Sequence, residues 1–304
     1  MLLKMLRLFD AKIIVKYLAA PAILVFCLVW PRLAPAELIG QRHVELAYDV
    51  YLGGFLAGSV DLTVDHADGR YEIAATSRSH GLLDFLIEFR RRNKTTGKLI
   101  EQQAKPANYD AEGVWAGRTR SVQIEYGAGD RLRFTARPNA AEDEREAVPA
   151  RLLPGTVDPL SALYMAVLRT GERDGCNGKS KIFDGRRRYD LRFETIGDGK
   201  AEGPFYSGLA RVCRMRQIPI AGFSQKTWLP RLVRPEWTDI WLAKPGDNMP
   251  AVPVRLQADA GLGDMVAHLV AVGGRKQPPG NLRPADAVPD PAADDSLQDP
   301  LRRQ

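Results

Sequence analysis

Apolar and polar side chains alternate with a period of two along much of this chain. The alternation is clearest in three consecutive runs, residues 43–52, 56–64 and 71–75. Gly53-Gly54 and Asp68-Gly69 separate these runs, and such dipeptides favour tight turns between strands. Because every second residue of a strand faces the same side of a sheet, the pattern predicts an antiparallel meander with one buried face.

Short runs with the same period continue towards the C-terminus. They are residues 122–126, 132–136, 189–193, 209–213, 237–242, 252–258 and 265–272. Turn residues separate the runs, which is typical of all-β folds. We therefore predict one mainly β domain over residues 37–273, in which a strongly curved antiparallel sheet forms an incomplete barrel or β-spiral.

Residues 156–159 read Thr-Val-Asp-Pro and are the clearest helix start in the sequence. Asp158 can accept a hydrogen bond from an N–H of the first turn, and Pro159 suits the first helical position because it needs no hydrogen-bonded N–H. Apolar residues then recur at helical spacing, at Leu160, Leu163, Tyr164, Val167 and Leu168. We predict a helix over 159–169, ended by Gly171, that packs across the sheet.

A second break in the alternation, residues 81–89, is too apolar for a surface loop and predicts a short helix or a buried corner. Arg90, Arg91, Arg92 and Lys94 follow at once. An apolar segment beside cations can bind to a membrane surface. The alternative, which we favour, is a solvated strand with alternating cations, because four cations are few for an electrostatic anchor.

The first 36 residues differ from the rest. Basic residues (Lys4, Arg7, Lys12 and Lys16) precede an apolar run over 17–30, and Ala34-Pro35-Ala36 offers the small residues that a signal peptidase recognises. We predict a secretory signal peptide over 1–36, cleaved after Ala36, and a periplasmic protein. An uncleaved anchor is the alternative, but the apolar run is shorter than the roughly 20 residues that span a bilayer. Residues 274–304, rich in Pro, Ala and Asp, predict a disordered tail.

The net charge of the chain adds little to this interpretation. The chain has a formal net charge of +6, but residues 1–36 hold five basic residues and one acidic residue, so that the remainder is at about +2. A basic balance would suggest nucleic acid as a partner, and that suggestion disappears with the signal peptide.

Cleavage would also leave two cysteines of three, Cys176 and Cys213. A pair in an exported protein predicts a disulfide, here one that joins two neighbouring strands and stabilises by roughly 3–4 kcal/mol. Two free buried thiols are the alternative. Two cysteines with no histidine nearby in sequence make a poor metal site, and we predict neither a metal nor a cofactor.

No catalytic motif is recognisable. The competing hypothesis is a hydrolase acting on an envelope polymer, with His80, Asp84 or Asp184 as candidate groups. Asp184 precedes Gly185 in a turn dipeptide, and Asp190 lies on a polar strand face between Arg188 and Arg192, so turn formation and charge pairing are the simpler roles. We therefore predict that the protein is not an enzyme.

Several segments together resemble the DUF3108 family of exported bacterial proteins of unassigned function, over roughly residues 43–272. They are the segments at 51–58, 156–162, 183–190, 219–223 and 240–243, together with Cys213. The resemblance implies a periplasmic protein. By architecture alone, the expected fold is also similar to periplasmic lipoprotein carriers, in which a curved sheet wraps around helices and an apolar cavity.

These patterns predict a non-enzymatic periplasmic protein of the cell envelope, a scaffold or partner-binding protein. One short helix is too small to fill a barrel of more than ten strands, so the concave side of the sheet is also a candidate site for an apolar envelope component. The partner of the protein would be an envelope protein or a lipid-like ligand, with peripheral membrane contact as a further candidate, and no nucleic acid. Arg187 alternates inward and would need an ion pair or a polar ligand. The candidate ligand or partner surface comprises Leu82, Leu83, Phe85, Leu86, Trp115, Arg187, Trp237 and Trp241. The alternative is that the tryptophans and the 82–89 segment close the interior completely.

Overall fold

The computed structural model describes residues 42–101, 103–143, 145–173, 175–223, 235–247, 249–260 and 263–275. The predicted signal peptide lies outside the described residues, as does the predicted tail except for Gly274 and Arg275. Within the described ranges, no helix combines the length and apolar character needed to cross a bilayer.

The alternating runs form strands, as predicted, and the first seven strands make a continuous antiparallel meander. They are β1 (Arg42–Leu52), β2 (Phe55–Ala67), β3 (Arg70–Ser79), β4 (Phe89–Ile100), β5 (Gln103–Trp115), β6 (Arg118–Tyr126) and β7 (Leu132–Arg137). Each strand pairs with the next along the chain. We call β1–β7 the first arm of the sheet.

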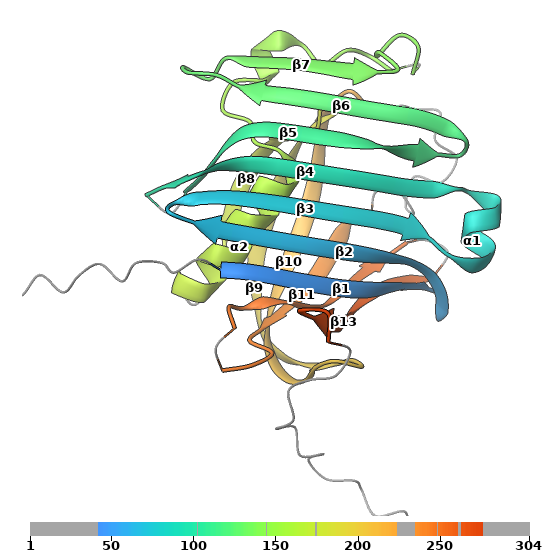
Figure 1. Cartoon of the computed structure of the whole chain (residues 1–304), viewed down its shortest axis with the longest axis vertical. Coiled ribbons are helices and arrows are strands. Elements are labelled where there is room, and N and C mark those ends of the chain that lie inside the picture. The colour runs from blue at the N-terminus through green and yellow to red at the C-terminus, as the bar shows by residue number, and fades with distance from the viewer. Residues whose placement is uncertain are drawn as a thin grey trace, which may run out of the picture. The chain divides into compact units, whose positions relative to one another are not determined.

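The remaining strands form the second arm. They are β8 (Gly178–Phe183), β9 (Arg188–Glu202), β10 (Ser207–Ala221), β11 (Trp237–Ala243), β12 (Val252–Asp259) and β13 (Asp264–Val272). Because β13 pairs with β1, both arms belong to one 13-stranded antiparallel sheet with β7 and β8 at its edges. The sheet curves without closing into a barrel, which confirms the predicted fold class (Figure 1).

Helix α2 (Pro159–Arg173) lies between the two arms (Figure 1). It begins as predicted, because Asp158 Oδ1 accepts a hydrogen bond from the amide of Ser161 at 2.9 Å. It does not end at Gly171 but continues to Arg173. A glycine within a helix costs only about 1 kcal/mol relative to alanine, so it does not by itself stop one.

Both sides of α2 are buried. Ala162 and Ala166 pack with Ile182, Leu191 and Ile240 of the second arm. On the opposite side, Met165 packs with Tyr71, Ile73 and Ala104 of the first arm. The helix therefore acts as the core between the arms at one end of the sheet.

Two shorter helices complete the fold. Residues Gly81–Leu86 form α1, which confirms the predicted short helix between β3 and β4, and Ala150–Leu152 form the 3-10 helix η1.

The open edge between β7 and β8 is bridged by side chains. The rings of Phe134 on β7 and Phe183 on β8 meet edge to face, with 4.8 Å between their centroids.

Cys176 and Cys213 form a disulfide, with 5.9 Å between their Cα atoms. The prediction that it joins neighbouring strands is wrong. Cys176 precedes β8 and Cys213 lies on β10, and β9 separates the two strands. The turn at Asp184 and Gly185 folds the intervening chain into the β8–β9 hairpin, so the bridge crosses over Thr195 of β9, whose hydroxyl accepts a hydrogen bond from the Cys176 amide.

Candidate ligand-binding cavity

A cavity of about 630 Å³ lies inside the curve of the sheet. It is lined by the C-terminal ends of β1, β3 and β5, the N-terminal ends of β2, β4 and β6, and by β11–β13 on the other arm. Helix α2 packs against the opposite ends of the first-arm strands. The cavity is thus the part of the interior that α2, about 22 Å long at 1.5 Å per residue, does not reach.

Most of the cavity wall is apolar. The apolar side chains that line it include Val50, Leu52, Val60, Leu83, Ile87, Phe89, Val114, Trp115, Val122, Phe223, Leu256 and Met265. Those on strands come mainly from the inward positions of the period-two pattern, which explains how a simple alternation builds a continuous apolar surface. Gly113 on β5 also lines the cavity, but it contributes no side chain. A Cβ atom there would lie 2.0 Å from the carbonyl oxygen of Arg90, so only glycine fits this close approach of β4 and β5.

Cationic side chains gather on one part of this wall. We call Arg91, Arg120, Arg145, Arg186 and Arg187, all of which line the cavity, the arginine cluster. Arg91 on β4 pairs in register with Gly113 on β5, which in turn pairs with Arg120 on β6. The three residues therefore form one row across neighbouring strands, with the two arginines on either side of a residue that has no side chain.

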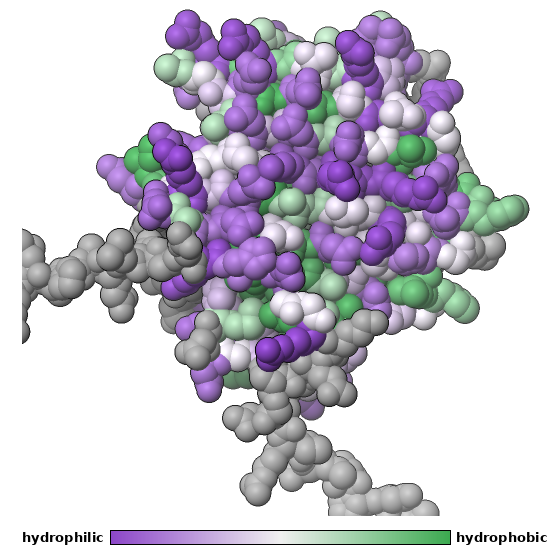
Figure 2. Space-filling view, in the orientation of Figure 1, coloured by the Kyte–Doolittle hydropathy of each residue, from purple (hydrophilic) through white to green (hydrophobic). Residues whose placement is uncertain are grey.

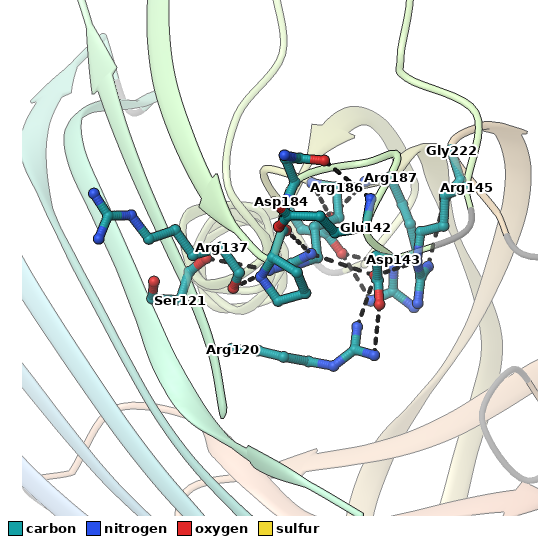
Figure 3. Close-up of polar contacts among 12 residues, drawn as sticks. Arg120, Ser121, Arg137, Glu142, Asp143, Arg145, Asp184, Arg186, Arg187 and Gly222 are labelled. Atoms are coloured by element: carbon teal, nitrogen blue, oxygen red, sulfur yellow. Dashed lines mark hydrogen bonds and ion pairs between the residues drawn. The ribbon is translucent and has the colours of Figure 1, made fainter. Parts of the chain in front are cut away.

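Asp143 is the anchor of three of these arginines (Figure 3). Its carboxylate accepts hydrogen bonds from Arg120 at 2.8 Å, from Arg145 at 2.6 Å and from Arg186 at 3.3 Å. A second nitrogen of Arg120 forms an ion pair with it at 2.7 Å. Burial alone would raise the pKa of Asp143, but the hydrogen bonds and charges of Arg120 and Arg145 outweigh it and hold that pKa below its ordinary value. Asp143 is therefore ionised at neutral pH.

Asp184 organises the turn between β8 and β9. Its Oδ1 accepts the amides of Arg186 and Arg187 at 3.0 and 2.7 Å, and its Oδ2 pairs with the Arg187 guanidinium at 2.7 Å. Burial opposes ionisation of Asp184, yet the Arg187 charge and these hydrogen bonds keep its pKa below the ordinary value. The inward Arg187 thus has an ion-pair partner, and its guanidinium also lies 5.8 Å from the ring centre of Phe223.

Arg186 closes the edge of the sheet. It donates to the carbonyl oxygens of Arg137 and Pro138 at 2.5 and 2.8 Å and to that of Ser121 at 3.3 Å (Figure 3). These contacts connect the β8–β9 turn to β6 and to the end of β7, across the unpaired edge. The guanidinium of Arg186 therefore holds these segments together through its hydrogen bonds.

The structure brings together only part of the predicted surface. Leu83, Trp115 and Arg187 line the cavity, whereas Phe85 and Leu86 on α1 are 87% and 64% exposed. The side chain of Leu82 lies outside the described residues.

The other two predicted tryptophans lie elsewhere. Arg214 lies over the ring of Trp237 at 4.6 Å, and Arg255 lies over that of Trp241 at 5.0 Å, each distance measured from the guanidinium carbon to the ring centre. Trp241 also packs against a core cluster of β1, β12 and β13. Neither lines the cavity, so they do not close the interior.

The candidate catalytic groups are held in separate contacts. His80 Nε2 lies 2.9 Å from Ser59 Oγ, Ser79 Oγ donates to Asp84 at 2.5 Å, and Asp184 pairs with Arg187. Among the residues that the structure describes, no carboxylate bonds to the His80 ring. In the same parts of the chain, no group of three or more His, Cys, Asp or Glu side chains is placed to hold a metal ion.

Sequence reasoning missed Arg91, Arg120 and Asp143. A signal existed for Arg120, which shares its period-two face with Val122 and Ile124, both buried. Similarly, Arg91 alternates with the inward Phe89. Asp143 gave no such signal, because it lies in the polar connection after β7.

Comparison with known proteins gives a family but no activity. Residues 47–270 match the family model described as protein of unknown function (DUF3108). No curated protein matches the chain. A crystal structure of a β-barrel-like protein of the domain of unknown function DUF1849 from Brucella abortus is similar over 77% of this chain and 98% of that chain, with 10% sequence identity and a TM-score of 0.44.

Proposed function

This chain belongs to the DUF3108 family of proteins of unknown function, and we propose that it is a non-enzymatic binding protein that holds an apolar or amphipathic molecule inside its curved sheet. The observation that carries the proposal is the cavity of about 630 Å³ with its mostly apolar wall. Ligand sites in proteins are typically concave, largely apolar and about 300–1,000 Å³ in volume.

A hollow of this kind is costly for a protein that uses only its outer surface. Protein interiors are normally close-packed, and side chains around an empty space lose the contacts that a filled core would give them. A bound molecule with an apolar body would restore those contacts. This reasoning favours ligand binding over a scaffold that only contacts partner proteins.

The alternative is a hydrolase that uses Ser59 and His80, since their contact of 2.9 Å has the spacing of a nucleophile and its base. Ser59 Oγ also accepts a hydrogen bond from Arg78 Nε at 3.0 Å, which competes for the same oxygen. A base of this type normally has a third group that orients its ring. Because the described residues supply no such carboxylate, we favour binding without catalysis.

We further propose that the protein works in the periplasm and receives its ligand at a membrane surface. The buried disulfide supports an oxidising compartment. Exposed apolar residues gather at the end of the sheet where the cavity lies, on α1 and at the start of β2, and Figure 2 shows hydrophobic groups at the right-hand edge over these two elements. We call Phe55, Leu56, Phe85 and Leu86 the apolar rim.

Binding of the neutral fluorescent probe N-phenyl-1-naphthylamine tests the proposal. We expect saturable binding to the wild-type protein and loss of binding in Ala267→Trp, because Ala267 of β13 lines the cavity and the indole would occupy it. The matched control is Val266→Trp, the adjacent residue of β13, which is not part of the cavity wall. Equal binding by all three proteins, or none by the wild type, would contradict the proposal.

Native mass spectrometry of protein purified gently from membranes gives a second readout. Recurrent adducts with the mass of a lipid would support a ligand-holding role. Protein that is always free of adducts and also fails to bind the probe would leave the scaffold hypothesis.

A further inference from the structure

Arg91 differs from the other members of the arginine cluster because it has no acidic partner. Its Nε donates to Asn93 Oδ1 at 2.8 Å, and within the part of the chain that the structure describes no carboxylate pairs with its guanidinium. The side chain is nevertheless half-buried and lines the cavity. A cation held against an apolar wall without a counter-ion is costly unless something neutralises it.

The neighbouring phenol does not neutralise it. Tyr109 on β5 donates to the same Asn93 Oδ1 at 3.1 Å. Burial raises the pKa of Tyr109 to about 12, although the charge of Arg91 acts in the opposite direction. Tyr109 is therefore an uncharged neighbour at physiological pH and supplies no negative charge to Arg91.

The charge balance of the whole cluster points the same way. Seven arginines line the cavity, and the two outside the cluster, Arg78 and Arg90, pair with Asp61 and Glu88. The five arginines of the cluster share two described carboxylates, those of Asp143 and Asp184, so positive charges exceed their paired negative charges by three within the cluster. In addition, Nε of Arg120 is buried without a hydrogen-bond partner among the described residues. Unpaired buried donors are uncommon in proteins and call for an explanation.

The strand register places Arg91 and Arg120 on the same part of the cavity wall. Arg91 and Arg120 stand on either side of Gly113 in a row across three strands, so the two side chains are roughly 10 Å apart at their backbones, twice the usual spacing of about 4.8 Å between strands. Gly113 adds no side chain between them, and β4 and β5 approach closely at this point. Two guanidinium groups on one part of a cavity wall match the oxygens of a carboxylate or a phosphate, with which arginine forms charge-assisted hydrogen bonds.

We propose that the arginine cluster, with Arg91 and Arg120 at its centre, binds the anionic headgroup of an amphiphile, a carboxylate or a phosphate, while the apolar wall holds its tail. This inference rests on the proposed ligand-binding function and assigns the chemical class of the ligand. Arg186 and Asp184 hold the site in shape, since their contacts fasten the β8–β9 turn to β6 and β7. The ligand is thus oriented, with its charged end at the cluster and its tail towards Leu52, Leu83 and Trp115.

Displacement of N-phenyl-1-naphthylamine by four twelve-carbon ligands tests the assignment. The ligands are dodecanoate, dodecyl phosphate, dodecanol and dodecyltrimethylammonium, with inorganic phosphate alone as a fifth arm. We expect the two anions to bind at least about tenfold more tightly than dodecanol, the cation to bind more weakly than dodecanol, and inorganic phosphate to displace no probe. The preference between dodecanoate and dodecyl phosphate then identifies the headgroup.

The variant Arg91→Gln should abolish this preference by weakening the two anions about tenfold, with dodecanol unchanged. Its matched control is Arg92→Gln, the next residue of β4, which is exposed, does not line the cavity and pairs with Glu112. Arg91→Lys keeps the charge and should keep most of the preference, which separates electrostatics from a folding defect. A melting temperature within a few degrees of wild type is required of each variant.

The possible failures are distinguishable. If the probe does not bind wild-type protein at all, the proposed function is wrong and the headgroup site falls with it. If the probe and dodecanol bind but the anions show no preference, or if Arg91→Gln and Arg92→Gln behave alike, the cavity stands and the headgroup assignment is overturned. Binding of inorganic phosphate as tight as that of dodecyl phosphate would overturn the amphiphile, because the tail would contribute nothing.

Discussion

Arg120 donates a hydrogen bond of 2.8 Å to Asp143 Oδ2, and its Nη2 forms an ion pair with Asp143 Oδ1 at 2.7 Å. The pair joins β6 to the connection that follows β7. It also decides how much positive charge the cavity wall presents, because the same carboxylate serves Arg145 and Arg186. Asp143 therefore contributes both to the stability of the fold and to the charge of the cavity wall.

The first prediction follows from these two contributions. Asp143→Asn should lower the free energy of unfolding by roughly 3 kcal/mol, as removal of one partner from a buried ion pair typically does. If the arginine cluster holds an anionic headgroup, the same change should tighten dodecanoate binding, because more positive charge faces the cavity. Urea unfolding and probe displacement measure the two effects. Glu142→Gln, an exposed neighbour, is the control, and a variant that loses both stability and dodecanoate affinity would contradict the prediction.

A second prediction concerns acid. Burial alone would raise the pKa values of Asp143, Asp184 and Asp190, but the arginines beside them hold each below the ordinary value of 3.8. In the window between the lowered folded values and 3.8, the unfolded chain binds more protons than the folded one, so stability falls as pH falls. We expect the free energy of unfolding to decrease as pH drops below about 4, with full stabilisation from these groups above that value.

Urea unfolding at pH 5, 4 and 3 measures this loss. Asp158 gives a contribution of opposite sign, because burial raises its pKa despite hydrogen bonds from Ser161 and Thr95. The prediction is therefore for the net effect of three carboxylates against one. A protein equally stable at pH 5 and pH 3 would contradict it.

The sequence predicts the strands and the start of α2 because these depend on local signals. Alternation determines which face of a strand is buried, and the cap at Asp158 acts on an amide only three residues away. The cavity could be inferred only as one of two outcomes, since it depends on how far α2 reaches into a sheet whose curvature no local pattern specifies. The composition of its wall follows from alternation once the strands are paired.

The arginine cluster was largely beyond sequence reasoning. Arg91 and Arg120 lie on strands that are separated by β5, and their row depends on two registers at once. Asp143 reaches the cluster from an irregular connection, where neither period applies. Only Arg187 and Asp184 were within reach, because they belong to the same tight turn.

A third prediction tests the disulfide and the compartment together. Alkylation of periplasmic protein without reductant should leave Cys176 and Cys213 unmodified, because they are bonded to each other and buried. Replacement of both by serine should cost roughly 3–4 kcal/mol for a loop with a sequence separation of 37 residues. In a domain of this size that is a fall of about 10 °C in melting temperature. Ready alkylation of both thiols in native material would contradict the bond and weaken the argument for export.

A fourth prediction concerns catalysis. Ser59→Ala removes the hydroxyl that lies 2.9 Å from His80 Nε2. If the protein acts by binding alone, hydrolysis of p-nitrophenyl acetate and p-nitrophenyl laurate should be at the buffer rate for wild type and variant alike, while probe binding is retained. Hydrolysis by the wild type that disappears in Ser59→Ala would revive the hydrolase hypothesis.

The last prediction tests the apolar rim as a membrane contact. Phe55 is 81% exposed at the start of β2 and Phe85 is 87% exposed on α1, so replacing both by serine removes few internal contacts and should leave the melting temperature nearly unchanged. Insertion of a phenylalanine into a bilayer surface can contribute about 1.5–3 kcal/mol, so the double variant should bind vesicles of anionic and zwitterionic phospholipid at least tenfold more weakly. The control is Leu209→Ser on β10, which removes a side chain that is also largely exposed but lies outside the rim.

Cosedimentation measures binding of the protein to vesicles, and the rate at which the probe moves from vesicles to protein measures ligand transfer. If the rim delivers the ligand to the cavity, transfer should slow while equilibrium binding of free probe stays the same; unchanged vesicle binding and unchanged transfer would show that these side chains serve another surface.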